Sequence, residues 1–446
     1  MDSLAHLDEG LTCVQETHSS KHVAVIGGGY AGMAAAVTLA QNGVKVTVYE
    51  AGGVLGGRAR QLSHAQLDTP LDNGQHLLLG AYQTTLALAR LVNPNTTIWL
   101  QQPLTLHSEN GLQLSAPQLP APFNTLLALL TAHGISTAQR WAAIAFMLQQ
   151  RLRGFKLKQD CSVVQLLAKQ PDVLIKLLWE PLCLAALNTP IATASAQVFL
   201  NVLRDSLTRS QHDSDLIIPS VDLSAFFPTP AADYVRQRGG SVNLHQRIRH
   251  ISASPDGYTI DGNQHSHVIC AVAAHQVAAL ISKLPELAPI AQQLKTYSYQ
   301  PITTVYLQYP PHIRLPRPMT GLTDTIAQWV FDRGITHQQH GLLAVVISTA
   351  GAHSALDHAT LATRIAAELQ QTFATPPTAI WHQVIVEKRA TFACDVDLPR
   401  PAQHTALANF HLAGDYTASD YPATLEAATQ SGVKCAHLIL ATNNTH

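Results

Sequence analysis

The segment that most constrains this chain is a glycine-rich stretch near its N-terminus, which joins two apolar strands through a helix. Residues 23–50 read VAVIGGGYAGMAAAVTLAQNGVKVTVYE. The pattern predicts a buried strand over 23–26, an alanine-rich helix over 33–41 that ends at Asn42-Gly43, and a second strand over 44–49. Short apolar strands that alternate with helices are typical of a parallel sheet in an α/β fold.

The glycines of this stretch fit a dinucleotide site. Gly27, Gly29 and Gly32 form G-x-G-x-x-G, and Glu50 follows Gly32 by 18 residues (50 − 32). Gly27 would allow the tight turn, Gly29 would let the backbone approach a pyrophosphate, and Gly32 would allow close packing of helix and strand. Glu50 would accept hydrogen bonds from a ribose. The alternative is a plain glycine turn in another α/β protein.

Two loops after this unit are further candidates for the site. The loop AGGVLGGRA contains Gly57 and Arg58, whose backbone amide and guanidinium suit a phosphate, unless it is a flexible surface loop. The second loop, LDNGQHLLLG over 71–80, contains four polar or glycine candidates: Asn73, Gly74, Gln75 and His76. Polar residues beside an apolar run indicate a loop that lines one side of a binding site, although an ordinary turn with a hydrogen-bonded histidine has the same pattern.

Composition limits the classes of partner. The 446 residues suffice for two domains, and the net charge of −1 gives no indication of nucleic-acid binding. Charged residues make up 13%, about half the usual share, so apolar surface is left for a core, a greasy ligand or a membrane. The six cysteines contain no C-x-x-C pair, which favours a reducing cytoplasm. Residues 1–20 lack an apolar signal-peptide region and are expected to form a loose tail.

The middle of the chain, from about 81 to 225, is predicted to be mostly helical. The helix expected over 138–152 lies in a basic and apolar segment, 140–158, that suits either a core helix with a solvated end or a membrane surface. Further along, Glu180 and Asn188 stand among apolar neighbours. Buried polar groups need partners, so these two are expected to be structural caps or cavity groups.

The last third returns to strands. Four short strands are predicted after Gly239-Gly240, over 241–244, 246–252, 258–261 and 267–272. A second sheet is predicted from strands over 299–309 and 342–348, followed by a helix over 361–372 and another strand over 379–387. The chain closes with a strand over 410–413, Gly414-Asp415 and a helix over about 423–440. The histidine pairs H-x-H and H-x-x-H have no nearby cysteines or paired carboxylates, so no metal site is predicted.

The first unit, the loop ending at Arg58 and the Gly414-Asp415 strand end together resemble the FAD-dependent amine oxidase and phytoene desaturase superfamily. The resemblance implies a mixed α/β fold, with a Rossmann-like FAD-binding domain of the glutathione-reductase and amine-oxidase type and an inserted substrate domain of mixed sheet plus helices. The implied FAD-binding domain is discontinuous, over 21–80, 231–295 and 405–446, and the substrate domain covers 81–230 and 296–404. The cofactor residues implied by the resemblance are Asp415 at the ribitol, Ile248 at the adenine, and Thr424 and Leu425 where the last helix points at the flavin.

Within the superfamily the chain most resembles the hydroxysqualene dehydroxylase family. The residues that carry this resemblance are 72–82, 179–190 and 218–235, and Ala427 departs from it by replacing a usual glycine. The resemblance implies a long-chain isoprenoid lipid substrate, peripheral contact with the inner membrane from the cytoplasmic side, and an external electron donor. His76 and Glu180 are the predicted acids.

Four functions stay open at this point, the fourth being oxidation of an amine by another flavoenzyme activity of the amine-oxidase family. The first is reductive removal of the hydroxyl of hydroxysqualene, which gives squalene. The second is a carotenoid-type desaturation, which runs in the opposite redox direction on the same cofactor. The third is binding of a prenyl lipid without catalysis. Intact glycines, Glu50 and Asp415 argue against the third, because a protein without flavin has no need of both half-sites.

Overall fold

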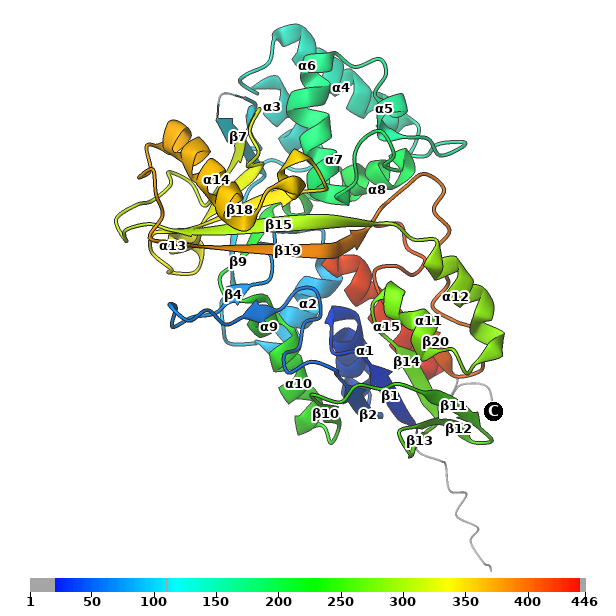
Figure 1. Cartoon of the computed structure of the whole chain (residues 1–446). Helices are drawn as coiled ribbons and strands as arrows, with labels where there is room; N and C mark the ends of the chain where they lie inside the picture. Colours follow the sequence, from blue (N-terminus) through cyan, green and yellow to red (C-terminus); the bar gives the residue numbers. More distant parts are fainter. Residues whose placement is uncertain (1–20, 110, 442–446) are drawn as a thin grey trace, which may run out of the picture.

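The computed structural model describes residues 21–109 and 111–441 in three layers (Figure 1). Figure 1 shows a group of helices above, a sheet with two long strands across the middle, and a smaller sheet covered by helices below. The tail expected over 1–20 lies outside the described residues. Within the described ranges, no helix is both long and apolar enough to cross a membrane.

The lower sheet is parallel throughout and is assembled from three separate parts of the chain. Its strand order is β10-β2-β1-β14-β20. The strands are β1 (His22–Ile26), β2 (Lys45–Tyr49), β10 (Ser241–Asn243), β14 (His267–Cys270) and β20 (Phe410–Leu412). All five were predicted as short strands from separate parts of the sequence, and the parallel α/β sheet predicted from the first unit is confirmed.

Helices cover this sheet closely. The lower helices are α1 (Tyr30–Gln41), α2 (Gln83–Val92), α9 (Leu223–Phe226), α10 (Pro228–Gln237), α11 (Ala274–Leu280), α12 (Ala288–Lys295) and α15 (Leu425–Ala441). The first and last of them, α1 and α15, cross where Gly432 has no side chain, because a Cβ there would lie 2.0 Å from the carbonyl oxygen of Ala31. The two ends of the described chain are therefore packed against each other.

A small antiparallel sheet follows β10 and differs from the prediction at one end. It consists of β11 (Ile251–Ser254), β12 (Gly257–Ile260) and β13 (Asn263–His265). The strand expected over 246–252 begins only at Ile251. The reason is that the backbone amides of His245 and Gln246 bond to the carbonyls of Gly52 and Glu50, so this segment follows the loop after β2 instead of a strand partner.

The middle sheet has seven strands in the order β19-β15-β18-β17-β16-β7-β8. They are β7 (Thr105–Glu109), β8 (Gln113–Ser115), β15 (Tyr299–Gln308), β16 (Met319–Leu322), β17 (Trp329–Asp332), β18 (Leu342–Ser348) and β19 (Trp381–Phe392). Neighbours are antiparallel except for β16 and β7. Two helices accompany it, α13 (Arg333–Thr336) and α14 (His358–Phe373). This is the mixed sheet predicted for the substrate domain.

The helices at the top belong to the region predicted as mostly helical. They are α3 (Phe123–Leu130), α4 (Thr137–Leu152), α5 (Val163–Leu166), α6 (Asp172–Leu174), a π-helical segment (Ile175–Trp179), α7 (Glu180–Leu187) and α8 (Ala196–Leu207). Between α6 and α7 the helix is continuous, and the π-helical segment lies next to Pro181, which lacks the N–H that an α-helix would require.

The same region also contains strands that the prediction missed. Besides β7 and β8, it contributes β6 (Trp99–Gln102) and β9 (Leu216–Pro219), which pair with β5 (Leu78–Leu79) in the order β5-β9-β6. A further short pair is β3 (Gln61–Leu62) with β4 (Leu71–Asp72). Such short apolar runs are ambiguous between helix and strand by periodicity, and only their partners across the sheet decide them.

Candidate functional site

A cavity of about 1400 Å³ lies between the parallel sheet and the middle sheet. Ligand pockets usually enclose roughly 300–1000 Å³, so this cavity has room for a large cofactor together with a second molecule. One end is lined by glycines and polar groups, and the other by aliphatic and aromatic side chains.

The three glycines of the first motif have three different surroundings. Gly27 has a φ of +112°, and a Cβ there would lie 2.6 Å from the oxygen of Ala271. At Gly32 a Cβ would lie 1.9 Å from the oxygen of Gly27, so this glycine allows the helix to pack on the strand. At Gly29, in contrast, the nearest protein atoms lie 3.9 Å away, and the residue lines the cavity. Among the described residues, no protein atom lies close enough to Gly29 to require a glycine there, and the open space is available to a ligand.

Glu50 faces the cavity with its carboxylate held in place. One carboxylate oxygen accepts from the amide of Gly28 at 2.7 Å, and the other accepts from the amide of Gly52 at 2.6 Å. A carboxylate has about four acceptor positions, so these bonds leave capacity for two hydroxyl donors. The geometry suits the ribose contact predicted for this residue.

Most predicted cofactor residues meet at the polar end of the cavity. The ones that line it are Gly27, Gly29, Glu50, Gly57, Arg58, Asn73, Gly74, Gln75, Ile248, Gly414, Asp415, Thr424 and Leu425. Gly32 does not line it, in agreement with its packing role. The N-terminus of α1 has neither a side-chain cap nor an acidic residue in its first turn, so its free amides can receive a phosphate. The open space at Gly29 and this donor set fit a dinucleotide cofactor.

Arg58 and Asp415, predicted to contact different parts of FAD, contact each other directly. An Nη2–Oδ1 ion pair of 2.6 Å joins them, and Nη1 of Arg58 donates to the oxygen of Ala390 at 2.9 Å. Because Ala390 belongs to β19, this arginine connects the N-terminal loop, the middle sheet and the C-terminal strand end. The structure thus gives Arg58 a partner other than the phosphate predicted for it.

Arg400 is a site residue that the sequence reasoning missed. Its guanidinium donates to the carbonyl oxygens of Asp415, Ser419 and Tyr421, which follow β20 on the way to α15. The sequence gives only a proline-flanked arginine in a loop, and the contacts depend on residues 15 to 21 positions away. Arg400 therefore fixes the backbone that carries Asp415.

The start of α15 is held by its neighbour α2. Glu426 accepts from the amides of Thr84 and Thr85 at 3.0 and 2.9 Å, and from the hydroxyl of Thr85 at 2.7 Å. Helix α2 has no side-chain cap of its own, so Glu426 supplies that cap from α15. Ala427 is buried and does not line the cavity, so its methyl group, where relatives usually have glycine, does not narrow the site.

His76 lines the cavity next to this polar end. Its Nδ1 bonds to the carbonyl of Gly74 at 2.8 Å, and since a carbonyl only accepts, Nδ1 carries the proton. Burial lowers the pKa of His76, and the charge of Arg58 lowers it further, against the effect of the Gly74 hydrogen bond. At neutral pH the ring is thus neutral, and Nε2 is an acceptor.

Glu180, the other predicted acid, does not reach the cavity. It begins α7 and is half-buried, whereas Leu182, Ala185 and Ala186 of the same helix line the cavity wall. Its predicted place among cavity groups was wrong, because the helical surface that faces the cavity is the one that carries these three apolar residues. Asn188 ends α7 in a left-handed conformation and bonds to Thr391 and Thr349, so it is both a cap and a cavity residue.

The apolar end of the cavity is built from both the upper helices and the middle sheet. Its larger lining side chains are Leu104, Leu106, Leu182, Phe199, Val202, Leu203, Leu216, Ile302, Met319, Trp329, Phe331 and Val346. The region predicted as mostly helical, from about 81 to 225, supplies only part of this surface. In the structure the strands of the middle sheet contribute half of the wall, since their apolar side chains face the parallel sheet across the cavity.

Comparison with known proteins agrees with this architecture. A family model of flavin-containing amine oxidoreductases matches residues 30–440. The chain is 29% identical over 436 residues to the hydroxysqualene dehydroxylase of Zymomonas mobilis, covering 94% of this chain and 98% of that protein. It is 25% identical over 476 residues to the zeta-carotene desaturase of Synechocystis, covering 94% and 97%.

Solved structures give the same fold. An oxidoreductase from Methanosarcina mazei superimposes with a TM-score of 0.72 at 15% identity, and covers 94% of this chain and 100% of its own. The family match spans nearly the whole chain and the cavity fits a dinucleotide. The chain therefore belongs to the flavin-containing amine oxidoreductase family, and its cofactor is FAD.

Proposed function

We propose that this chain is an FAD-dependent oxidoreductase that removes the hydroxyl of hydroxysqualene by reduction and yields squalene. The observation that carries the proposal is the cavity itself, in which a cofactor end continues into a long apolar end, with the polar loop 74–76 between them. The relative from Zymomonas mobilis bears the name of this activity and is matched along its whole length. A long apolar cavity suits an extended isoprenoid chain.

We assign the cofactor contacts as follows. Glu50 accepts from the ribose, the N-terminus of α1 and the open space at Gly29 take the pyrophosphate, Ile248 borders the adenine, and Asp415 takes the ribitol. The start of α15, at Thr424 and Leu425, lies at the flavin. When bound in its reduced form, FAD supplies the hydride that replaces the hydroxyl.

The protein's own residues have three tasks in this reaction. They must hold the lipid, exclude water that would recapture a carbocation, and provide a proton, because hydroxide leaves poorly unless it departs as water. The apolar wall meets the first two tasks. His76 is our candidate for the third, and it can donate from Nε2 only when its ring is doubly protonated.

A single turnover without oxygen tests the proposal. Photoreduced enzyme is mixed with hydroxysqualene, and both the flavin spectrum and the lipid are followed. We expect the flavin to re-oxidise as one squalene and one water form per hydroxysqualene consumed, since one hydride and one proton are transferred. A flavin that stays reduced would refute the proposal.

Desaturation of a polyene is the second candidate, and the relative from Synechocystis with that name favours it. In that case the oxidised enzyme should bleach when phytoene or another polyene is added, and reduced enzyme should ignore hydroxysqualene. The two outcomes have opposite redox directions, so one pair of titrations separates them.

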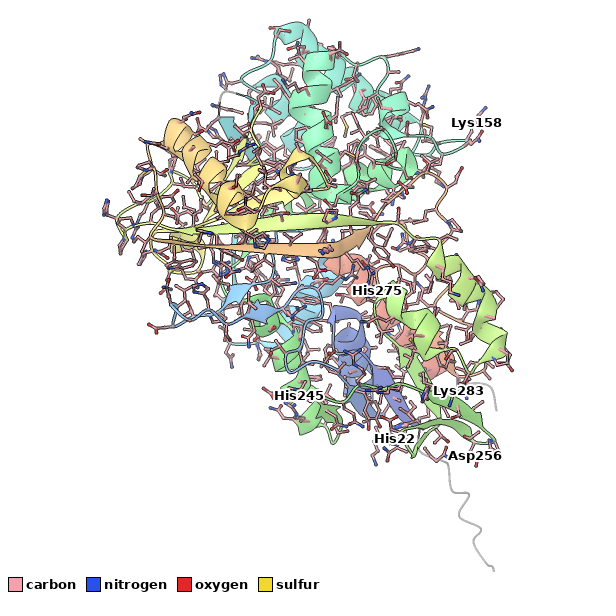
Figure 2. All side chains as sticks on the ribbon, in the orientation of Figure 1. His22, Lys158, His245, Asp256, His275 and Lys283 are labelled. Atoms are coloured by element: carbon pink, nitrogen blue, oxygen red, sulfur yellow. The ribbon has the colours of Figure 1, made fainter. Side chains whose placement is uncertain are left out.

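We also propose that the enzyme collects its substrate at the cytoplasmic face of the inner membrane and is recharged by an external electron donor. The upper helices expose an unusual number of large apolar side chains: Phe123, Leu127, Trp141, Leu148 and Leu152. Basic residues follow at Arg151, Arg153, Lys156 and Lys158, the last of which points away from the molecule in Figure 2. A surface of this kind suits an interface with anionic lipid.

A further inference from the structure

The amide of Gln75 has an orientation that the structure forces. Its Oε1 accepts from Nη1 of Arg333 at 2.9 Å. A guanidinium has donors only, so the amide oxygen must face Arg333 and the NH2 group must face away from it. Gln75 lines the cavity, and within the described residues its Nε2 donates to no protein group.

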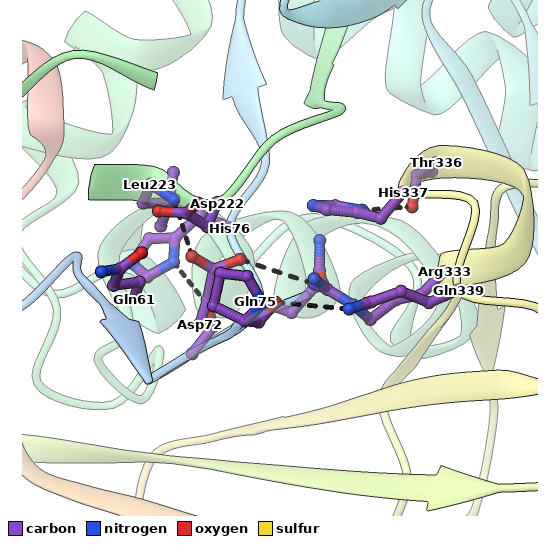
Figure 3. A network of polar contacts seen from close by, with 12 residues as sticks. Gln61, Asp72, Gln75, His76, Asp222, Leu223, Arg333, Thr336, His337 and Gln339 are labelled. Carbon is purple, nitrogen blue, oxygen red and sulfur yellow. Dashed lines mark hydrogen bonds and ion pairs between the residues drawn. The ribbon is translucent and has the colours of Figure 1, made fainter. Parts of the chain in front are cut away.

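The arginine that imposes this orientation is itself held on several sides (Figure 3). Arg333 is fully buried, and its Nε donates to Gln339, which in turn donates to the hydroxyl of Thr69 at 2.7 Å. Its Nη1 also lies 3.5 Å from Oδ2 of Asp72. These contacts join α13 of the middle sheet to the strand that leads into the Gln75 loop. They hold the guanidinium at Nε and Nη1, whereas Nη2 has no hydrogen-bond partner among the described residues.

Asp72 belongs to the same buried network. Its Oδ1 accepts from the amide of Leu223 at 2.7 Å, and its carbonyl accepts from the hydroxyl of Tyr306 at 2.9 Å. Burial raises the pKa of Asp72 to about 6 in spite of the charge of Arg333, which is consistent with the long ion pair. Gln75 is thus the closest side-chain acceptor of Nη1, at 2.9 Å against 3.5 Å.

The free amide lies where the two ends of the cavity meet. Leu77 and Leu79, just after the loop, pack in one cluster with Met319 and Phe331, which line the apolar end. On the other side, His76 is close enough to the cofactor end that the pKa of its ring, lowered by burial, is lowered further by the charge of Arg58. A bound hydrocarbon offers no acceptor to an N–H donor at this junction, whereas the oxygen of a bound alcohol can accept a hydrogen bond from it.

We propose that Gln75 donates a hydrogen bond from Nε2 to the hydroxyl oxygen of the lipid alcohol, and that Arg333 is the positioning residue that turns this amide toward the cavity. This inference rests on the proposed function, which makes an alcohol the substrate. It assigns recognition of the hydroxyl group to Gln75, while the apolar wall recognises the chain. A hydrocarbon of the same skeleton should bind more weakly, because it leaves the amide unpaired.

The decisive variant is Gln75→Glu. A glutamate keeps the size and an acceptor for Arg333 but removes the NH2 group, so it deletes the donor while adding a carboxylate charge. Oxidised holoenzyme is titrated with hydroxysqualene and with squalene, by the change in flavin absorption or tryptophan fluorescence. We expect the wild-type enzyme to bind the alcohol about tenfold more tightly than the hydrocarbon, and Gln75→Glu to lose about that factor. The affinity for squalene should stay within about twofold.

Three further variants are controls for this experiment. Gln75→Leu removes the donor without adding a charge, and it should lose the preference as Gln75→Glu does. Arg333→Lys frees the amide to rotate and should weaken the preference while leaving FAD bound. Gln276→Glu adds the same carboxylate to another residue of the cavity wall, on α11, and should keep the preference.

The outcomes separate this inference from the function on which it rests. If wild type converts hydroxysqualene but Gln75→Glu keeps the full preference, the recognition role is overturned and the function stands. If wild type prefers the alcohol and Gln75→Glu does not, yet no squalene forms in the single turnover, recognition stands and the function is overturned. If Gln75→Glu alters FAD content or the flavin spectrum without changing the preference, the amide serves the cofactor and the proposal is wrong.

Discussion

At the scale of single residues, Gly29 and Gly32 of the first motif are glycines for different physical reasons. Gly32 is required by the protein, because a Cβ would meet the backbone of Gly27 at 1.9 Å. Gly29 is required by none of its protein neighbours, the nearest being 3.9 Å away, and its backbone φ of −78° suits any residue. The motif therefore contains one glycine that the packing of helix on strand requires and one that leaves space for a ligand.

The first prediction contrasts these two positions. Gly29→Ala should fold with an unchanged melting temperature in the absence of FAD, yet bind FAD at least about tenfold more weakly, a change of about 1.4 kcal/mol. Gly32→Ala should lower the free energy of unfolding by about 1–3 kcal/mol through overpacking. Calorimetric unfolding of apoprotein and fluorescence titration with FAD measure the two effects. Normal FAD affinity in folded Gly29→Ala would contradict the assigned pyrophosphate site.

The second prediction concerns the protonation of His76. If the doubly protonated ring delivers the proton, kcat/KM for hydroxysqualene should rise as the pH falls. It should level off only below the ordinary histidine pKa of 6.5, because burial and Arg58 lower the pKa of this ring. His76→Gln should flatten this limb of the pH profile and lower the rate by about 10²–10⁴. A rate that instead rises with pH would mean that His76 acts as a base.

At the scale of secondary-structure elements, the site depends on helices that stabilise each other's ends. Helix α2 lacks a local cap, and Glu426 from α15 supplies it with three hydrogen bonds. The same turn of α15 carries Thr424 and Leu425 at the cavity. One carboxylate thus joins the capping of α2 to the placement of a cofactor-facing helix end.

The third prediction tests this contact between Glu426 of α15 and the start of α2. Glu426→Ala should lower the free energy of unfolding by about 2–4 kcal/mol, because two buried backbone amides and a hydroxyl lose a charged acceptor. FAD affinity should fall as well, since the start of α15 is no longer held. Glu426→Gln keeps one acceptor oxygen and should lose roughly half as much. Chemical denaturation of the apoproteins gives the comparison, and equal stability of all three proteins would exclude the capping role.

At the scale of the whole molecule, the upper helices present an exposed surface unlike the rest. Leu152 is 90% exposed, Phe123 is 60% exposed and Trp141 is 58% exposed, although all three are large and apolar. Arg151 and Arg153 flank the first of them. The layer that contributes α7 and α8 to the apolar end of the cavity therefore also carries these exposed apolar side chains.

The fourth prediction is that this surface attaches the enzyme to membranes. The triple change Arg151→Glu, Arg153→Glu and Lys156→Glu should weaken binding to anionic vesicles by about 3 kcal/mol, roughly a hundredfold, since each basic residue near such a surface contributes about 1 kcal/mol. Vesicle co-sedimentation measures the loss.

A matched control carries the same charge change elsewhere. Lys283→Glu lies in the turn after α11, Lys295→Glu on α12 and Arg364→Glu on α14, and Lys283 is far below Lys158 in Figure 2. This variant should keep most of its affinity for vesicles. If both triple variants sediment alike, the membrane-facing surface lies elsewhere.

The sequence by itself determined the parts of this protein whose physical demands are local. The turn at Gly27, the helix that ends at Gln41, the strand that delivers Glu50 and the parallel sheet all follow from glycine geometry and from the spacing of apolar residues over a few tens of positions. The same local reasoning identified the loop 73–76, which does line the cavity.

Tertiary structure alone decided the rest, because the remaining groups depend on partners far along the chain. Arg333 orients Gln75 across 258 positions, Glu426 caps Thr85 across 341, and Arg58 pairs with Asp415 across 357. The short strands β6 and β9 are strands only through their pairing in the order β5-β9-β6. Glu180 was placed wrongly for the same reason, since which side of α7 faces the cavity is set by packing between layers and not by the sequence around the residue.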